Sequence, residues 1–302
     1  MFIQYLEWVI GLTGHLGDFI LEFKRSGVSL QRLQALVPDS PGRSLVSSSS
    51  DFPAAVKGEQ QKTPAALRVR GLTYRYGLSD NGIQHADLEV EPGQLTVITG
   101  SMGVGKTTLL RSILGLLPAQ SGQIQWNGKD VSAPALFFVP PRCAYVAQAP
   151  RLFSGSLADN ITLGLEATQE QVLNAVRNAV LERDVHSMSE GIETRVGPRG
   201  LRLSGGQVQR TAMARALVRT SDLLVLDDLS SALDVEVEQE LLDRLLSGGQ
   251  TILAVSHRPR VLERAASVVL VHDGRVVAQG SLATLLASND EMKRLWRSNE
   301  DA

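Results

Sequence analysis

The feature that most constrains this chain is a glycine-rich loop between an apolar strand and an apolar helix. The strand is expected at residues 94–99, and the helix at residues 107–117 is expected to stop at Pro118. The loop reads Gly-x-x-x-x-Gly-Lys-Thr and consists of Gly100, Ser101, Met102, Gly103, Val104, Gly105, Lys106 and Thr107. Because glycine allows sharp backbone turns, successive N–H groups of such a loop can point at phosphate oxygens, and the following helix start adds its positive dipole. In this context the pattern predicts a nucleoside triphosphate site on an α/β fold.

Within this loop we expect separate roles for the side chains. Lys106 is expected to contact the β- and γ-phosphates, and the Thr107 hydroxyl to ligate Mg²⁺. Thr108, the next residue, is expected to take part in binding the nucleotide. The alternative is an ordinary glycine-rich turn with a surface lysine, and the strand and helix on either side argue against it.

The composition fits a soluble globular core and argues against several classes of protein. The chain has 302 residues, of which 43% are apolar and 21% charged. Its formal net charge of -2 provides no basic field for nucleic acid. The single cysteine, Cys143, excludes an internal disulfide and favours a reducing compartment. No segment reaches the run of about 18 apolar residues that a membrane span requires.

The beginning of the chain differs in composition from the rest. Residues 1–36 are expected to be helical because apolar side chains recur at three-, four- and seven-residue spacings. A second short helix is expected at residues 30–36. Residues 37–65 are rich in proline, glycine and serine and are expected to form a flexible linker.

From residue 66 onward strand and helix patterns alternate. Residues 223–226 and 251–255 are continuous apolar runs, as expected of parallel strands buried on both faces. Residues 156–190 are mostly helical in pattern. Asn127-Gly128 and Asp273-Gly274 are tight-turn signals, the second of which predicts a hairpin.

Two adjacent carboxylates, Asp227 and Asp228, follow the strand at residues 223–226. Ligands bind at the carboxyl ends of strands in open α/β sheets, and a carboxylate there can hold Mg²⁺ through water. Asp227 is therefore the candidate metal residue. Asp228 is the candidate group that orients or deprotonates an attacking water. The alternative is a paired carboxylate at a strand end.

A second candidate anion site is the run Leu203-Ser204-Gly205-Gly206-Gln207. Ser204 is a good helix N-cap, and Gln207 three residues later completes a capping box. Gly205 and Gly206 leave bare amides at that helix start. An ordinary capped helix is the alternative.

This pentapeptide, placed upstream of the carboxylate strand, resembles the signature of the ABC ATPase family, and the resemblance extends over about residues 66–290. It implies a P-loop NTPase core with a mixed, mainly parallel sheet flanked by helices. It also implies an antiparallel β subdomain and a helical signature subdomain at about residues 150–215. An N-terminal helix would precede this core, and residues 291–302 would form a tail.

The same resemblance implies roles for further residues. Tyr76 matches the aromatic residue that stacks on adenine, with Tyr74 as the nearby competitor. Gln148 matches the glutamine that touches Mg²⁺, and His257 the histidine that contacts the γ-phosphate. Residues 231–234 match the loop that crosses the dimer interface.

The family pattern also implies partners, with ATP and Mg²⁺ as cofactors. Two ATPase domains meet head to tail, so Ser204, Gly205, Gly206 and Gln207 are expected to act on the nucleotide of a second domain, in a homodimer or a heterodimer. Residues 151–161, 194–200 and 280–296 resemble exporters, although residues 194–200 lack the usual acidic residue. A transmembrane permease domain is therefore an expected partner, nucleic acid is not, and the expected location is the cytoplasmic face of the cell membrane.

In exporters the permease precedes the ATPase on the same chain. Residues 1–36 are therefore interpreted as a remnant of the last transmembrane helix, and the chain as the C-terminal part of a fused permease–ATPase. The acidic residues Glu7, Asp18 and Glu22 also fit a plain amphipathic helix.

One departure from the family pattern concerns Asp228, because most members have glutamate there. Aspartate is one methylene shorter, and a displacement of about an ångström can cost on the order of 10²-fold in rate. The sequence thus predicts MgATP binding with weak hydrolysis, as in the degenerate site of a heterodimer. The alternatives are a nucleotide-gated regulatory subunit and a soluble ABC ATPase of DNA repair or translation; the second would carry a coiled-coil insertion or two tandem domains, which this sequence lacks.

Overall fold

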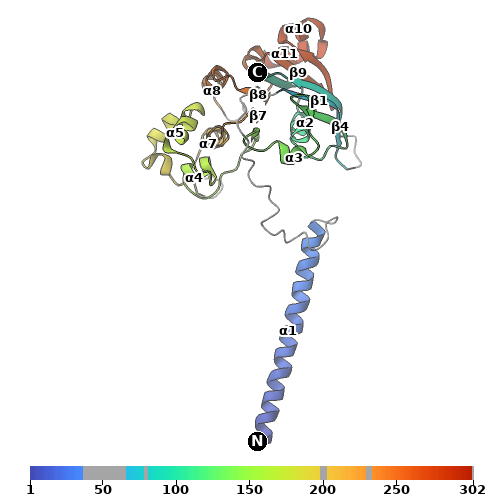
Figure 1. Cartoon of the computed structure of the whole chain (residues 1–302), viewed down its shortest axis with the longest axis vertical. Coiled ribbons are helices and arrows are strands. Elements are labelled where there is room, and N and C mark those ends of the chain that lie inside the picture. Colours follow the sequence, from blue (N-terminus) through green and yellow to red (C-terminus); the bar gives the residue numbers. More distant parts are fainter. Residues whose placement is uncertain (37–65, 78–80, 198–202, 229–232, 301–302) are drawn as a thin grey trace. The chain divides into compact units, whose positions relative to one another are not determined.

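The computed structural model describes residues 1–36, 66–77, 81–197, 203–228 and 233–300 (Figure 1). Its contacts divide the chain into two units, Met1–Glu59 and Gln60–Ala302. The predicted linker, residues 37–65, lies outside the described residues.

The first unit contains one long helix, α1, which spans Phe2–Leu36. The short second helix expected at residues 30–36 was a wrong prediction, because the backbone continues through Gly27 without a break. A single glycine costs a helix about 1 kcal/mol, which is not enough to end one that is otherwise well formed. Among the described helices, none combines the length and the apolar character needed to cross a membrane.

The second unit is built on a six-stranded sheet with the order β10-β9-β3-β8-β7-β6. Its strands are β3 Leu95–Thr99, β6 Cys143–Val146, β7 Leu223–Asp227, β8 Thr251–Val255, β9 Ser267–His272 and β10 Arg275–Gly280. All neighbouring pairs are parallel except β10 with β9, which form the predicted hairpin. The apolar runs predicted at residues 223–226 and 251–255 are confirmed as central strands, buried along their whole length.

Alternate residues of these strands enter different cores, because successive side chains of a strand point to opposite faces. Leu224, Leu226 and Ile252 belong to a core shared with the helices of residues 157–217. Leu223, Val225 and Leu253 belong to a second core. The two cores account for the continuous apolar pattern of both strands.

The second core is shared with a four-stranded antiparallel sheet of order β2-β1-β4-β5. Its strands are β1 Leu67–Arg75, β2 Gly82–Val90, β4 Ser121–Trp126 and β5 Lys129–Asp130. The turn between β4 and β5 has positive φ at both Asn127 and Gly128, as the Asn-Gly signal predicts. The antiparallel β subdomain inferred from the sequence is thereby confirmed.

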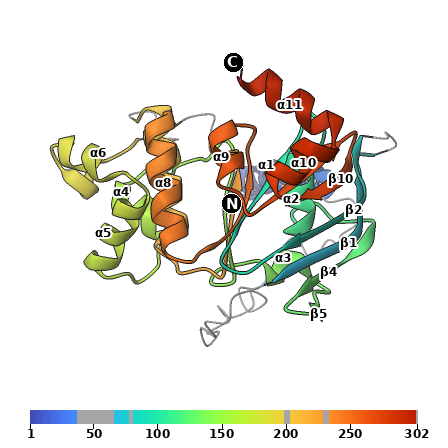
Figure 2. The ribbon, with the colours of Figure 1, turned by 90° about the horizontal axis from the view of Figure 1, so that it is seen from above.

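Figure 2 shows the helices of the second unit from above. They are α2 Lys106–Ile113, α3 Pro134–Phe137, α4 Leu157–Thr162, α5 Gln169–Asn178, α6 Glu182–Ser187, α7 Gly205–Leu217, α8 Val235–Ser247, α9 Pro259–Glu263, α10 Leu282–Ser288 and α11 Asp290–Glu300. Helix α2 ends four residues before the predicted Leu117. Gly115 has a φ of 71°, and a Cβ there would lie 2.3 Å from the backbone nitrogen of Ala135, so the chain turns at this glycine.

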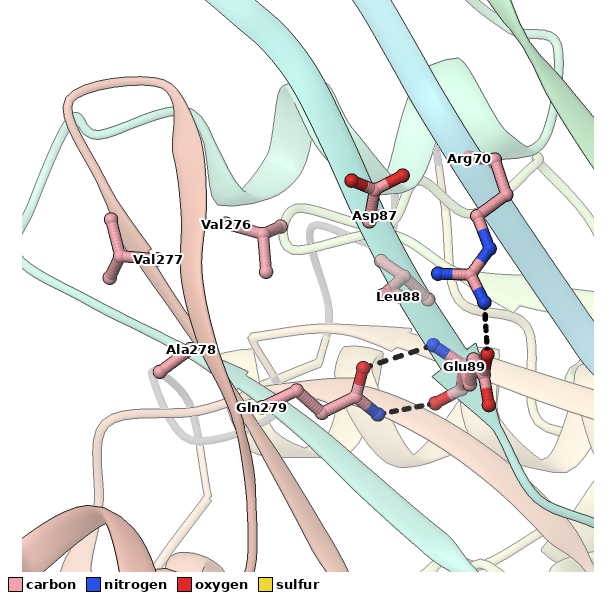
Figure 3. A pocket seen from close by; sticks show the side chains of 8 residues that line it. All are labelled: Arg70, Asp87, Leu88, Glu89, Val276, Val277, Ala278 and Gln279. Carbon is pink, nitrogen blue, oxygen red and sulfur yellow. Dashed lines mark hydrogen bonds and ion pairs between the residues drawn. The ribbon is translucent and has the colours of Figure 1, made fainter. Parts of the chain in front are cut away.

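The two sheets meet along a seam between their edge strands β2 and β10 (Figure 3). At one end the Gln84 N–H donates to the Gly274 carbonyl over 2.7 Å. At the other end the Gln279 side-chain amide makes the two backbone hydrogen bonds that a neighbouring strand would make. Its Nε2 donates to the Glu89 carbonyl over 2.6 Å, and its Oε1 accepts from the Glu89 N–H over 3.0 Å.

We expect Gln279→Ala to lower the free energy of unfolding by about 1–2 kcal/mol, because two backbone groups of Glu89 lose their partner. Urea denaturation of the full chain would measure this. Gln169→Ala, at an exposed position of α5, is the control and should leave the midpoint unchanged. Equal midpoints for Gln279→Ala and the wild type would show that the seam does not depend on this amide.

Candidate functional site

The candidate site lies at the carboxyl ends of four parallel strands. The glycine-rich loop follows β3, and Asp227 ends β7, which is two strands away in the order β3-β8-β7. His257 comes two residues after β8, and Gln148 two residues after β6. Parallel strands bring their carboxyl ends to one edge, so residues that are far apart in the sequence gather here.

The loop itself depends on backbone conformations that glycine tolerates. Gly100, Gly103 and Gly105 have φ values of 147°, 79° and 101°. A Cβ at Gly100 would lie 2.2 Å from the Val271 carbonyl oxygen, so no larger residue fits against β9 there. Helix α2 begins at Lys106, directly after the loop, and presents its unpaired N–H groups to the site.

The loop borders a pocket of about 630 Å³, which is within the usual size range for small-molecule sites. Most of the predicted site residues line it: Gly100, Ser101, Met102, Gly103, Gly105, Lys106, Thr107, Thr108, Gln148, Asp228 and His257. Val104 does not; its carbonyl accepts instead from the Gly274 N–H over 3.2 Å.

Lys106 lies across the loop. Its Nζ donates to the carbonyl oxygens of Gly100 and Ser101, over 2.7 Å and 2.8 Å. Burial lowers the pKa of Lys106, while the charges of Asp228 and Asp227 oppose that shift. The ammonium group therefore lies where it can exchange carbonyl partners for phosphate oxygens.

Asp227 is buried, with 1% of its surface exposed, and both of its carboxylate oxygens accept hydrogen bonds. The Thr107 hydroxyl donates to Oδ1 over 2.7 Å, which joins two of the three predicted metal residues directly. The Tyr145 hydroxyl donates to Oδ2 over 2.9 Å. Burial raises the pKa of Tyr145, so this hydroxyl keeps its proton and acts as a donor.

Asp228 and Gln148 also line the pocket. The Gln148 Nε2 donates to Asp228 Oδ2 over 3.0 Å, so two residues that are 80 positions apart are in contact. Asp228 has a φ of 55°, in the left-handed region that short polar residues tolerate better than long ones.

Tyr76 lies beside the pocket rather than in its wall. Its hydroxyl lies 3.3 Å from the Thr108 hydroxyl, and 44% of its surface is exposed. The Tyr74 ring meets it edge-on at a centroid distance of 4.9 Å, and Tyr74 is the more buried of the two. Tyr76 is therefore the better placed to offer a ring face to a ligand.

The predicted signature forms the start of α7, with the predicted capping box. Ser204 N–H donates to Gln207 Oε1 over 3.0 Å, and Gln207 N–H donates to Ser204 Oγ over 3.3 Å. Gln207 Nε2 also donates to Asp184 over 3.0 Å. Ser204 and Gly205 are exposed, and no signature residue lines the pocket of Lys106.

Sequence reasoning missed two contributors to the site. Tyr145 is one, because a tyrosine within an apolar strand carries no local signal of its contact with Asp227. Helix α11 is the other: Leu295 and Ser298 line the pocket, although residues 291–302 were expected to be a tail. Of the predicted interface loop at residues 231–234, Ser231 and Ala232 lie outside the described residues, as do residues 198–200 of the predicted exporter-like loop.

A comparison with known protein families identifies the domain that contains this pocket. Residues 83–231 match the family described as ABC transporter. The chain contains an ATP-binding domain of the ABC transporter family. The α/β core, the antiparallel sheet and the capped signature helix described above are thus those of an ABC ATP-binding domain.

Several relatives of this ABC domain are exporters that also contain a permease. The chain is 31% identical to the β-(1→2)glucan export ATP-binding/permease protein NdvA of Rhizobium johnstonii, over 99% of this chain and 50% of that protein. It is 36% identical to an ATP-dependent lipid A-core flippase of Pseudomonas fluorescens, over 76% of this chain and 39% of the flippase. The chain thus spans half or less of the length of these relatives.

A solved structure shows the same fold. It is a bacterial Atm1-family ABC exporter with ATP bound, which superposes with a TM-score of 0.78 at 25% identity. The likeness covers 91% of this chain and 48% of that one.

Proposed function

We propose that this chain binds and hydrolyses MgATP as the ATP-binding part of an ABC exporter. The observation that carries the proposal is the direct hydrogen bond between Thr107 and Asp227, because Thr107 lines the same pocket as Lys106. We expect both oxygen groups to face the β- and γ-phosphates of a nucleotide held by the loop. Tyr76, beside Thr108, would stack on the adenine.

The residues present fit Mg²⁺. The ion prefers oxygen ligands and keeps several waters, and the Thr107 hydroxyl, the Asp227 carboxylate and the Gln148 amide are such ligands. Thr107, Asp227 and Gln148 would hold the ion, which would supply positive charge beside the phosphates of the nucleotide. Asp228 would orient the attacking water, and His257 would contact the γ-phosphate from the end of β8.

The second half of each site would come from another ATP-binding domain. Ser204 and Gly205 are exposed at a helix start, and bare amides there suit the phosphates of a nucleotide held by a partner. The dimer would comprise two copies of this chain or this chain and a related one.

For the membrane side, we propose a permease as partner and the cytoplasmic face of the membrane as location. The alignment with NdvA covers 99% of the chain, so it includes most of α1 as well as the ATP-binding domain. This supports reading residues 1–36 as the end of a permease, residues 37–65 as a linker and residues 66–290 as the ATP-binding domain.

Sedimentation velocity of the full chain with MgATP tests the proposal. We expect MgATP to promote association of the wild type, and we expect Ser204→Arg to bind MgATP equally well but to stay monomeric. Ser247→Arg, at the exposed end of α8, is the matched control and should associate normally. A chain that binds no MgATP would contradict the proposal, and a wild type that binds MgATP but stays monomeric would place the second signature on a different chain.

A second candidate function is a nucleotide-gated subunit that hydrolyses little. Asp228 favours this function, because its side chain is shorter than glutamate and its carboxylate accepts a hydrogen bond from Gln148. The position of His257 in the pocket wall favours hydrolysis instead.

A further inference from the structure

The proposed mechanism does not use Tyr145, yet its hydroxyl contacts the buried Asp227 directly. The two strands that carry these residues are neighbours. In the parallel register of β6 and β7, Tyr145 lies opposite Val225, two positions before Asp227. Residues two apart share a face, so a long phenol side chain can reach diagonally to the carboxylate.

That face of the sheet is covered by α2. Tyr145 packs against the core that contains Leu109 and Leu110 of α2. Thr107 and Arg111 are one helical turn apart on the same helix, so both can face the end of β7. The Tyr145 phenol lies close enough to the Arg111 guanidinium to raise the pKa of Arg111.

Arg111 therefore lies beside Tyr145, and Tyr145 and Thr107 each donate a hydrogen bond to Asp227. The Asp227 carboxylate is almost completely buried, so it needs donors at both oxygens. With Tyr145 on Oδ2 and Thr107 on Oδ1, the plane of the carboxylate is fixed. Groups that hold a metal-binding carboxylate in this way tune the affinity of the metal.

We propose that Tyr145, supported by Arg111, is the positioning residue that orients Asp227 for Mg²⁺ in the nucleotide site. This inference rests on the MgATP site of the proposed function. Tyr145 donates to the carboxylate and does not touch the nucleotide. Its hydroxyl therefore affects the Mg²⁺ requirement of ATP binding and not the affinity for ATP alone.

Titration calorimetry of ATP into the full chain, with EDTA and then over a series of free Mg²⁺ concentrations, tests this. We expect Tyr145→Phe, which removes only the hydroxyl, to bind ATP in EDTA as the wild type does. The Mg²⁺ concentration for half-maximal tightening should rise by about 10-fold or more. Tyr5→Phe, at an exposed position of α1, is the matched control and should behave as the wild type.

A second pair of variants tests whether Arg111 supports Tyr145. Arg111→Met should raise the Mg²⁺ requirement by a smaller factor than Tyr145→Phe, and Arg111→Lys should restore part of the wild-type value. An unchanged Mg²⁺ requirement in Tyr145→Phe would overturn the inference, as would an equal loss of ATP affinity in EDTA, because the hydroxyl would then serve the whole pocket. A wild type that does not bind ATP at all would instead contradict the proposed function.

Discussion

Asp228→Glu is expected to raise steady-state ATP turnover by up to about 10²-fold. Glutamate extends the carboxylate by about an ångström towards the γ-phosphate region, and misplacement of that size accounts for a rate loss of this order. The wild-type carboxylate is instead held back at the pocket wall by the Gln148 amide, over 3.0 Å. Phosphate release by the full chain at saturating MgATP is the measurement.

The positive φ of Asp228 calls for a control at a residue with a similar backbone conformation outside the pocket. Asp228 has a φ of 55°, so the longer glutamate is expected to lower the free energy of unfolding slightly. Asp273, in the exposed turn between β9 and β10, has a φ of 44°. Asp273→Glu should show a similar loss of stability and no change in turnover. A wild type that already turns over quickly, and that glutamate does not improve, would refute the weak-site interpretation.

Lys106→Ala is expected to reduce turnover by about 10²–10³-fold, the range found when one preorganised donor to a developing charge is removed. MgATP affinity should fall as well, because we expect the Lys106 ammonium group to contact the β- and γ-phosphates. The loop should keep its conformation, since it depends on the positive φ values of Gly100, Gly103 and Gly105. Equilibrium binding of MgATP and phosphate release measure the two effects.

Lys129→Ala, at an exposed position of the β4–β5 hairpin, is the control for removal of a lysine and should leave both quantities unchanged. Retention of wild-type affinity and turnover by Lys106→Ala would mean that the pocket beside the loop is not a nucleotide site.

The parts of this protein that could be predicted from its sequence are those with a local pattern. Gly100 to Thr107 and Ser204 to Gln207 each carry their conformation in a few adjacent residues, and both loops lie as predicted. The burial of residues 223–226 on both faces follows from their continuous apolar run. The end of α2 at Gly115 could have been found from the glycine itself, which is a common helix stop.

Contacts between distant segments could not be predicted in this way. Nothing near Tyr145 indicates that its hydroxyl meets Asp227, because that contact depends on the register between β6 and β7. The Gln279 bridge to Glu89 depends on the approach of two sheets, and the contribution of Leu295 to the pocket depends on the packing of α11. Such contacts are set by the tertiary fold, which single-residue patterns do not encode.

The glycine at position 205 has a cost for the chain that carries it. A Cβ there would meet nothing within 4 Å, so the space around α7 would admit alanine. In the middle of a helix glycine is less favourable than alanine by about 0.5–1 kcal/mol, so helix propensity does not call for glycine at this first position either. Neither packing within this chain nor helix stability therefore accounts for glycine at position 205. The proposed dimer would account for it, because a helix start without a side chain lets the phosphates of the second domain's ATP approach the backbone of α7 closely.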